Sequence, residues 1–466
     1  MVDPESILIQ NGYVLTVNPM REIIPDGAVY IEGNEIKWVG KTDDFSGYTP
    51  ELTMDADNMV VMPGLIDTHV HLAQAMIRGT ADDVSLVDWL KKYVWVLQGN
   101  YTEEDGRASA ELCMAEMIRT GTTSFLECMI HTRYGFNGIA EAVEETGMRA
   151  ALSKIIMDST GYADSPDIMY PGMVEERDDC LRETEEMLSC WHGEAEGRIQ
   201  VWYGLRSLGA VTPNLFREVA RLADEHNTRM TMHLGEVEDD VRYVRDEYDM
   251  GLTEFAEEQG LLGPNMVFAH GVHLSDKDLD RLAKTKTNIS HCPASNMKLA
   301  SGFARVPEML NRGIPISLGC DGGPSNNTYD MIREMRLAAL VHKAIVDNPL
   351  VMSAEDVVEI ATLGGAAAMG IDDEVGSIEK GKLADIILVD MDSLSFTPSV
   401  NPVSNLVYSG CGTDVDTVLV NGKILMRDKE LLTLDEESVK QRARQQAADL
   451  LDRAEIDIEP KWPRRK

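Results

Sequence analysis

The chain has few positive charges for its length. Its 466 residues include 43 lysines and arginines against 79 aspartates and glutamates, which gives a formal net charge of −36. This balance argues against binding nucleic acid or an anionic lipid surface through bulk electrostatic attraction. It indicates a well-solvated acidic surface and leaves a small molecule as the expected partner.

Signals for membrane insertion, export and disulfide formation are also missing. No apolar run reaches the roughly 18 residues that a membrane-spanning helix needs, and no basic segment followed by an apolar one opens the chain. The seven cysteines are odd in number and form no Cys-x-x-Cys pair, which favours free thiols in a reducing compartment. We therefore expect a cytoplasmic protein.

Short strand-like runs separated by turn-forming residues occur near both ends of the chain, as in a β-meander. They cover residues 7–9, 13–17, 28–31, 36–39, 385–390 and 417–425. We expect residues 1–61 and 376–432 to join as one small β-sandwich. The C-terminal segment 433–466 is expected to contain a helix and a short basic tail.

Between these segments, residues 62–375 alternate strand-like runs with helical patterns. Eight strands alternating with helices predict an α/β fold, a (β/α)8 TIM barrel. The expected strands are 60–66, 122–126, 149–156, 199–204, 229–233, 266–270, 286–290 and 315–320. The expected helices include 102–120, 136–147, 174–191, 213–226, 252–259, 275–284, 304–312, 327–346 and 353–369.

Residues that bind metals stand at the ends of four of these runs. His69 and His71 are two positions apart, so on a strand both imidazoles point to the same side. His233, His270 and Asp321 end three later runs. A lone histidine at a strand end is more often structural, but four such ends at one face of a barrel favour a metal site.

The motifs around these residues resemble the amidohydrolase superfamily over nearly the whole chain. More closely, they resemble the branch that contains methylthioadenosine and S-adenosylhomocysteine deaminases and triazine chlorohydrolases. The run 63–71 (Pro-Gly-Leu-Ile-Asp-Thr-His-Val-His) carries much of the resemblance. The other matching runs are 233–236 (His-Leu-Gly-Glu), 269–274, 290–296, 321–327 and 376–385.

The resemblance implies one divalent metal per chain, zinc first, with iron or manganese as alternatives. It assigns the metal to His69, His71, His233 and Asp321. Three neutral imidazoles and one carboxylate leave a position for water, as an open catalytic site requires, and a bound metal makes hydroxide available near neutral pH. The resemblance also assigns catalytic roles to three residues. Glu236 is expected to shuttle a proton, His270 to orient the water, and Asp321 to accept a proton from it.

A second metal is not expected. Relatives with two metals use a carboxylated lysine on the fourth strand, and the expected fourth strand, 199–204, contains no lysine. Lys154 lies on the third run, where a lysine paired with an acidic residue is the simpler expectation.

The expected substrate-contacting residues resemble partly the nucleoside deaminases and partly the triazine hydrolases. Gln98 stands where the nucleoside deaminases carry a glutamate that binds ribose, and the histidine expected near Arg206 is missing. Arg206 is predicted either to pair with an acidic or carbonyl-rich substrate or to form a structural salt bridge. The full set of expected substrate contacts is Gln74, Trp89, Gln98, Arg206, His291, Asn296 and Ser325.

We interpret the sequence as a metal-dependent hydrolase that deaminates an amino-substituted nitrogen heterocycle. A triazine-type hydrolase, an adenosine-derivative deaminase and a guanine-type deaminase are the alternatives within this class. A non-catalytic barrel scaffold is the alternative from another class, although a scaffold needs no acid such as Glu236. The resemblance also implies a homodimer or a larger homo-oligomer.

Overall fold

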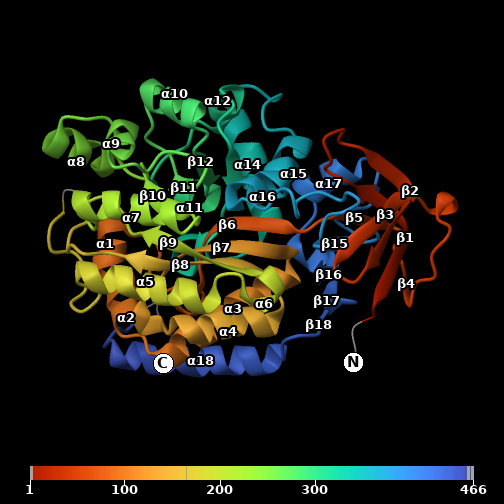
Figure 1. Cartoon of the computed structure of the whole chain (residues 1–466), viewed down its shortest axis with the longest axis horizontal. Coiled ribbons are helices and arrows are strands. Elements are labelled where there is room, and N and C mark those ends of the chain that lie inside the picture. Colours follow the sequence, from red (N-terminus) through yellow and green to blue (C-terminus); the bar gives the residue numbers. More distant parts are fainter. Residues whose placement is uncertain (1–3, 164, 459–461, 463–466) are drawn as a thin grey trace.

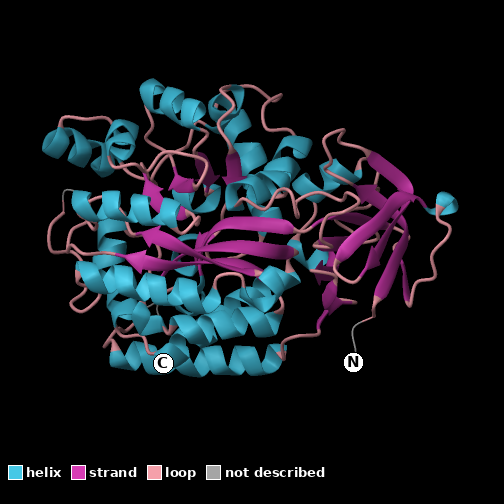
Figure 2. Cartoon of the chain, in the orientation of Figure 1, coloured by secondary structure: helices cyan, strands magenta, loops and turns pink. Residues whose placement is uncertain are grey.

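The computed structural model describes residues 4–163, 165–458 and 462. It consists of a barrel of parallel strands surrounded by helices and, beside it, a domain built of strands from both ends of the chain (Figure 1). Figure 2 shows the contrast between the helix-covered barrel and the strand-rich domain. Most of the expected basic tail lies outside the described residues.

From β6 (Leu65–His71) to β13 (Ile316–Leu318), the barrel strands follow one another in chain order, and each pairs in parallel with the next. The sheet closes where Asp321 pairs with Val70 of the first strand. The strands are β6 (Leu65–His71), β7 (Thr122–Ile130), β8 (Arg149–Ile156), β9 (Ile199–Leu205), β10 (Met230–Leu234), β11 (Met266–His270), β12 (Asn288–His291), β13 (Ile316–Leu318) and β14 (Asp321–Gly322). The predicted (β/α)8 barrel is confirmed.

Two predicted strands differ in detail. The first run, 60–66, belongs to two sheets: β5 (Met59–Pro63) pairs in the other domain, and the barrel strand begins only at Leu65. Between them, Gly64 packs so closely on Thr123 that a Cβ would collide with that side chain. The last run is interrupted at residues 319–320, where a Cβ on Gly319 would lie 2.6 Å from the His69 Cβ. Sequence apolarity continues across both breaks and therefore hides them.

The helices cover the outside of the barrel (Figure 2). Thr102 begins α3 with a capping box that includes Asp105, which satisfies backbone N–H groups at the helix start. The predicted helix 353–369 is two helices, because Thr362 leaves helical geometry (φ −123°, ψ −87°). The main helices are α3 (Glu103–Arg119), α4 (Phe136–Thr146), α5 (Arg177–Trp191), α7 (Pro213–Glu225), α8 (Glu238–Tyr248), α9 (Leu252–Glu258), α10 (Asp276–Thr285), α12 (Val306–Asn311), α14 (Met331–Ile345), α15 (Ala354–Ala361) and α16 (Leu363–Met369).

The two chain ends share one nine-stranded mixed sheet, as predicted for a common β-domain. Its halves meet where β5 pairs antiparallel with β15 (Ile386–Asp390), so that Met62 lies opposite Ile387. The sheet thus extends beyond the predicted boundary at residue 61. Its other strands are β1 (Ser6–Leu15), β2 (Ile23–Glu32), β3 (Glu35–Lys41), β4 (Leu52–Asp55), β15 (Ile386–Asp390), β16 (Val415–Val420), β17 (Lys423–Arg427) and β18 (Glu430–Leu431).

Two contacts fix the barrel to the rest of the chain. Arg149 at the start of β8 donates from Nε to Asp385 over 2.9 Å, and both side chains are buried. The C-terminal helix α18 (Glu436–Arg453) packs along α3, where Arg442 pairs with Glu111 at 2.5 Å (Figure 1). Among the described residues, no helix combines the length and apolarity needed to cross a membrane.

Candidate metal centre and active site

Three imidazoles and a carboxylate converge at the carboxyl ends of the barrel strands. His69 and His71 come from β6, His233 from β10 and Asp321 from β14. The Oδ1 atom of Asp321 lies 3.2 Å from His71 Nε2 and 3.7 Å from His69 Nε2. The Nε2 atoms of His71 and His233 are 3.3 Å apart. All four side chains are buried.

This cluster fits a metal cation. Neither ring nitrogen of His69 has a hydrogen-bond partner among the described residues, although both are buried. Burial lowers the pKa of His69, His71 and His233, so each offers a neutral imidazole with a free lone pair. Such lone pairs facing one another and a carboxylate at 3.2–3.7 Å have the spacing of ligands around one ion.

Two residues near the cluster had no predicted role. Cys128, on β7, places its sulfur 3.2 Å from His71 Nδ1, and it groups with the three histidines. Ser295 donates from Oγ to Asp321 Oδ2 over 2.5 Å and orients the carboxylate. Cys128 gave no sequence signal because it stands inside an apolar run beyond the expected strand end at residue 126. Ser295 lies in the quoted run 290–296 but is a common residue with no metal-ligand pattern.

The proposed acid–base residues stand beside this centre. Glu236 follows β10 on a turn that is held by a hydrogen bond from its own N–H to Asp240 (3.1 Å). Burial raises the pKa of Glu236. Its carboxylate lies 3.8 Å from His270 Nε2, and His270 in turn donates from Nδ1 to Asn296 over 3.0 Å.

His270 and Asp321 share an unusual backbone. Their φ angles are 74° and 68°, in the left-handed region that non-glycine residues seldom occupy. Each residue ends or restarts a barrel strand, so the turn aims its side chain inward toward the centre of the barrel. Backbone strain of this kind concentrates at functional sites.

A pocket opens onto the metal cluster, and three predicted substrate residues line it. They are Gln74, Trp89 and Arg206, and each has a buried polar atom without a hydrogen-bond partner among the described residues. The same pocket is lined by His71, His233, Glu236, His270 and Asp321. The pocket therefore joins unpaired polar groups to the predicted catalytic centre.

Four predicted substrate contacts lie elsewhere. Asn296 stands behind His270 and orients it. His291 pairs with His342 of α14, with 2.9 Å between their Nε2 atoms. Ser325 hydrogen-bonds to the backbone of Gly322 (3.0 Å). Gln98 is buried in α2 (Trp95–Gly99) and does not line the pocket. The positions of Asn296 and His291 depend on partners distant in sequence, whereas Ser325 is held within its own turn and Gln98 within α2.

Lys154 is paired with acidic residues, which confirms the simpler of the two expectations for it. Its ammonium lies 2.6 Å from Glu175 and 3.5 Å from Glu183, and the lysine is buried. It does not line the pocket at the metal cluster.

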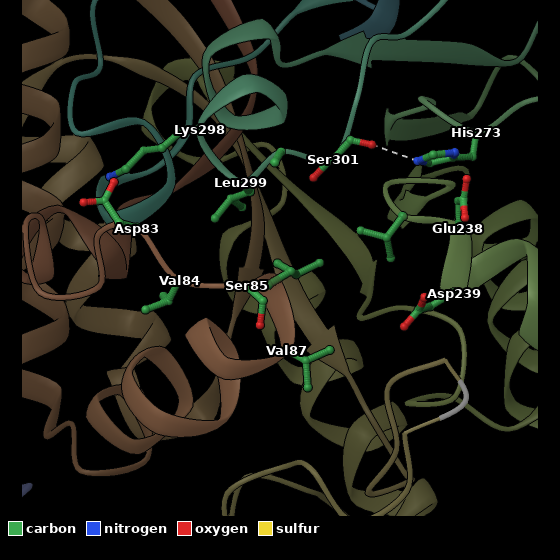
Figure 3. A pocket seen from close by; sticks show the side chains of 13 residues that line it. Asp83, Val84, Ser85, Val87, Glu238, Asp239, His273, Lys298, Leu299 and Ser301 are labelled. Carbon is green, nitrogen blue, oxygen red and sulfur yellow. Dashed lines mark hydrogen bonds between the residues drawn. The ribbon is translucent and has the colours of Figure 1, made fainter.

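An outer cavity of about 700 Å³ adjoins the inner pocket and shares Leu86 and Leu299 with it. Figure 3 shows this cavity between the segment 83–87, the start of α8 and the segment 298–301. One wall is held by a hydrogen bond from His273 Nε2 to the carbonyl oxygen of Ser301 (2.8 Å). A cavity of this volume is large enough for a small organic molecule, and it lies beside the inner pocket.

The amidohydrolase family model matches residues 60–425, which span the barrel and most of the C-terminal part of the β-domain. The chain belongs to the amidohydrolase family. As a member, it is a hydrolase that acts on carbon–nitrogen bonds.

The sequences and structures of similar proteins align with the amidohydrolase along almost its whole length. It is 38% identical to the 5'-deoxyadenosine deaminase of Methanosarcina mazei and 35% identical to the 5-methylthioadenosine/S-adenosylhomocysteine deaminase of Pelotomaculum thermopropionicum; each match covers 96% of this chain and 99% of the relative. A zinc-bound adenosine deaminase from Xanthomonas campestris matches with a TM-score of 0.89 at 28% identity, covering 96% of this chain and 98% of that one. Atrazine chlorohydrolase from Arthrobacter aurescens, complexed with zinc, matches with a TM-score of 0.88 at 25% identity, covering 95% and 100%. The predicted family and branch are thereby confirmed.

Proposed function

We propose that the amidohydrolase is a metal-dependent deaminase of a nitrogen heterocycle. In the reaction, the oxygen of water forms a bond to the ring carbon, the bond from that carbon to the exocyclic amino nitrogen breaks, and ammonia leaves. The observation that carries the proposal is the four-residue cluster beside Glu236 and His270, at one pocket that both of these residues and three of the cluster residues line. A scaffold protein has no need for a buried acid beside such a cluster.

The metal is proposed to be a single zinc ion, held by His69, His71, His233 and Asp321. It supplies the acidity that makes hydroxide available from water near neutral pH. The zinc in the two solved relatives supports this choice over iron or manganese. The ion pairs of Lys154 with Glu175 and Glu183 support one metal rather than two, because a carboxylated lysine would have to leave both acids.

The chain's own residues move the protons and hold the water. Glu236 takes a proton from the attacking water and gives it to the ring nitrogen beside the reacting carbon, a role for which its raised pKa suits it. His270, fixed by Asn296, presents Nε2 toward the same place and orients the water. Asp321 accepts the second proton and passes it to the departing amino nitrogen, which leaves as ammonia. Ser295 holds the Asp321 carboxylate in position.

The relatives' names support adenosine derivatives as one substrate class, and the structural likeness to a triazine hydrolase supports compact rings as another. Gln98, where nucleoside deaminases carry a glutamate, does not line the pocket and therefore supports neither class. A cytoplasmic location and a homo-oligomeric state complete the proposal; the free state of the seven cysteines supports the former.

An ammonia-release screen with zinc-loaded enzyme tests the proposal. The panel consists of purines, pterins, pyrimidines, s-triazines and adenosine derivatives, each as a matched base and riboside where both exist. Release of ammonia from at least one ring compound, abolished by chelation and restored by zinc, is the expected result. Release of chloride or an alkylamine in place of ammonia would move the enzyme to the triazine-hydrolase class.

A further inference from the structure

A buried arginine at the inner pocket has no anionic partner in the described part of the chain. Arg206 follows β9 and is 5% exposed. Its Nε and Nη1 atoms are buried and have no hydrogen-bond partner among the described residues. No acidic side chain of the described chain lies within ion-pair distance of its guanidinium, so the structural salt bridge considered from the sequence is absent.

The aromatic groups around Arg206 contact only the faces of its planar guanidinium group. Its guanidinium carbon lies 5.4 Å from the ring centroid of Trp95 and 5.9 Å from that of Tyr162. Aromatic faces attract a cation, but they accept no in-plane N–H hydrogen bonds. The edge of the guanidinium therefore keeps unused donors, and leaving a buried charge unpaired is costly for a folded protein.

The unused donors belong to the same pocket as the catalytic residues. Arg206, Trp89 and Gln74 all line it, and the free atoms are the guanidinium N–H groups, the indole N–H and the amide Oε1. Two of the three groups are donors, and one carries a full positive charge. The matching ligand surface is rich in acceptors and carries at least one oxygen with negative or partial negative charge.

We propose that Arg206 binds a carbonyl or carboxylate oxygen of the substrate, so that the substrate is an amino-heterocycle carrying such an oxygen. This inference rests on the proposed deaminase function and narrows its substrate class. The oxygen has two possible sources, a ring oxo group or a carboxylate on a substituent that extends into the outer cavity. An adenine ring with an uncharged substituent offers neither.

Matched substrate pairs separate these sources. Guanine is compared with 2-aminopurine and isoguanine with adenine, since the members of each pair differ only in the ring oxo group. S-adenosylhomocysteine is compared with methylthioadenosine, since its extra amino-acid portion carries a carboxylate. In at least one pair, kcat/KM should be about 10–100-fold higher for the oxygen-bearing member, the scale at which a site built for a polar group discriminates.

Three variants locate the preference. Arg206→Met should reduce the ratio within the preferred pair to near 1, while the zinc content stays at the wild-type level. Arg206→Lys keeps the charge but loses the planar fork, and it should retain part of the ratio; it also serves if the methionine variant does not fold. Arg198→Lys is the control: Arg198 is equally buried but donates to the backbone carbonyl of Met148 (2.7 Å), outside the pocket, so the ratio should not change.

Two results would overturn the inference. One is a wild-type enzyme that shows no preference within any pair, and the other is an Arg206→Met variant that slows both members of a pair equally. Absence of ammonia release from every compound would count against the proposed deaminase function instead. In that case, calorimetric binding of the same pairs to the zinc-loaded protein decides the inference, because tighter binding of the oxygen-bearing members must still disappear in Arg206→Met.

Discussion

The Nδ1 atom of His270 donates a hydrogen bond to Oδ1 of Asn296 over 3.0 Å. Because a carbonyl oxygen only accepts hydrogen bonds, this contact places the proton of the neutral imidazole on Nδ1. The Nε2 atom then carries the lone pair, and it faces Glu236 at 3.8 Å with no other partner in the described chain. Asn296 thus selects the tautomer that accepts a hydrogen bond from water.

The first prediction concerns this tautomer. Asn296→Leu removes the hydrogen-bond acceptor but keeps a side chain of similar volume. The kcat should fall about 10–100-fold, the scale known for residues that orient metal-binding histidines. KM and zinc content should change little. Asn296→Asp, which keeps an acceptor oxygen, should recover much of the activity. Equal activity of wild type and Asn296→Leu in steady-state assays would show that the tautomer does not matter.

The second prediction separates chemistry from metal binding at Glu236. Glu236→Gln keeps the shape of the side chain but cannot exchange a proton, so kcat should fall on the order of 10²-fold or more. The zinc content, measured by mass spectrometry, should equal that of wild type, because the carboxylate is not among the proposed ligands. Loss of zinc in this variant would make Glu236 a ligand and contradict its assigned role.

The clustering of the proposed metal ligands was predictable from the sequence because its signal is local. His69, His71, His233 and Asp321 each end an apolar run, and the carboxyl ends of barrel strands meet at one face. The break at Gly64 was not predictable, because β5 and β6 are both apolar and only long-range pairing assigns them to different sheets.

The substrate side was less predictable because it depends on distant partners. Whether His291 faces the pocket depends on His342, which lies 51 residues later and hydrogen-bonds to it. Arg206 illustrates the same limit: the sequence leaves both a salt bridge and a substrate contact open, and only the surroundings of the guanidinium in the described chain exclude the first. Cys128 lies beside the histidine cluster because β7 continues to Ile130, four residues past the expected end at residue 126.

The third prediction is the metal stoichiometry. Purified protein should hold about one divalent ion per chain, in line with a site of three histidines and one carboxylate. Chelation should lower the melting temperature, because an ion that binds only the folded state stabilises it by mass action. Lys154→Met should leave the ion count unchanged, although loss of its ion pairs will reduce stability. Two ions per chain, with one lost in Lys154→Met, would contradict the single-metal site.

The last prediction concerns the buried pair of His342 and His291. Burial, assisted by the positive charge of Lys343, lowers the pKa of His342 from 6.5 to about 4. Between pH 6.5 and about 4, the unfolded chain binds this proton and the folded chain does not. The contribution of His342 to the free energy of unfolding should therefore be complete above pH 6.5. It should fall by about 1.4 kcal/mol per pH unit as the pH drops toward 4.

His342→Gln removes the titrating ring, so its stability should fall less steeply over this range than that of wild type. The measurement is urea unfolding of the zinc-loaded proteins at several pH values, and the difference between the two curves isolates His342 from other titrating groups. Parallel curves for wild type and His342→Gln would show that the pair does not resist protonation, because the folded state would then take up the proton as readily as the unfolded chain does.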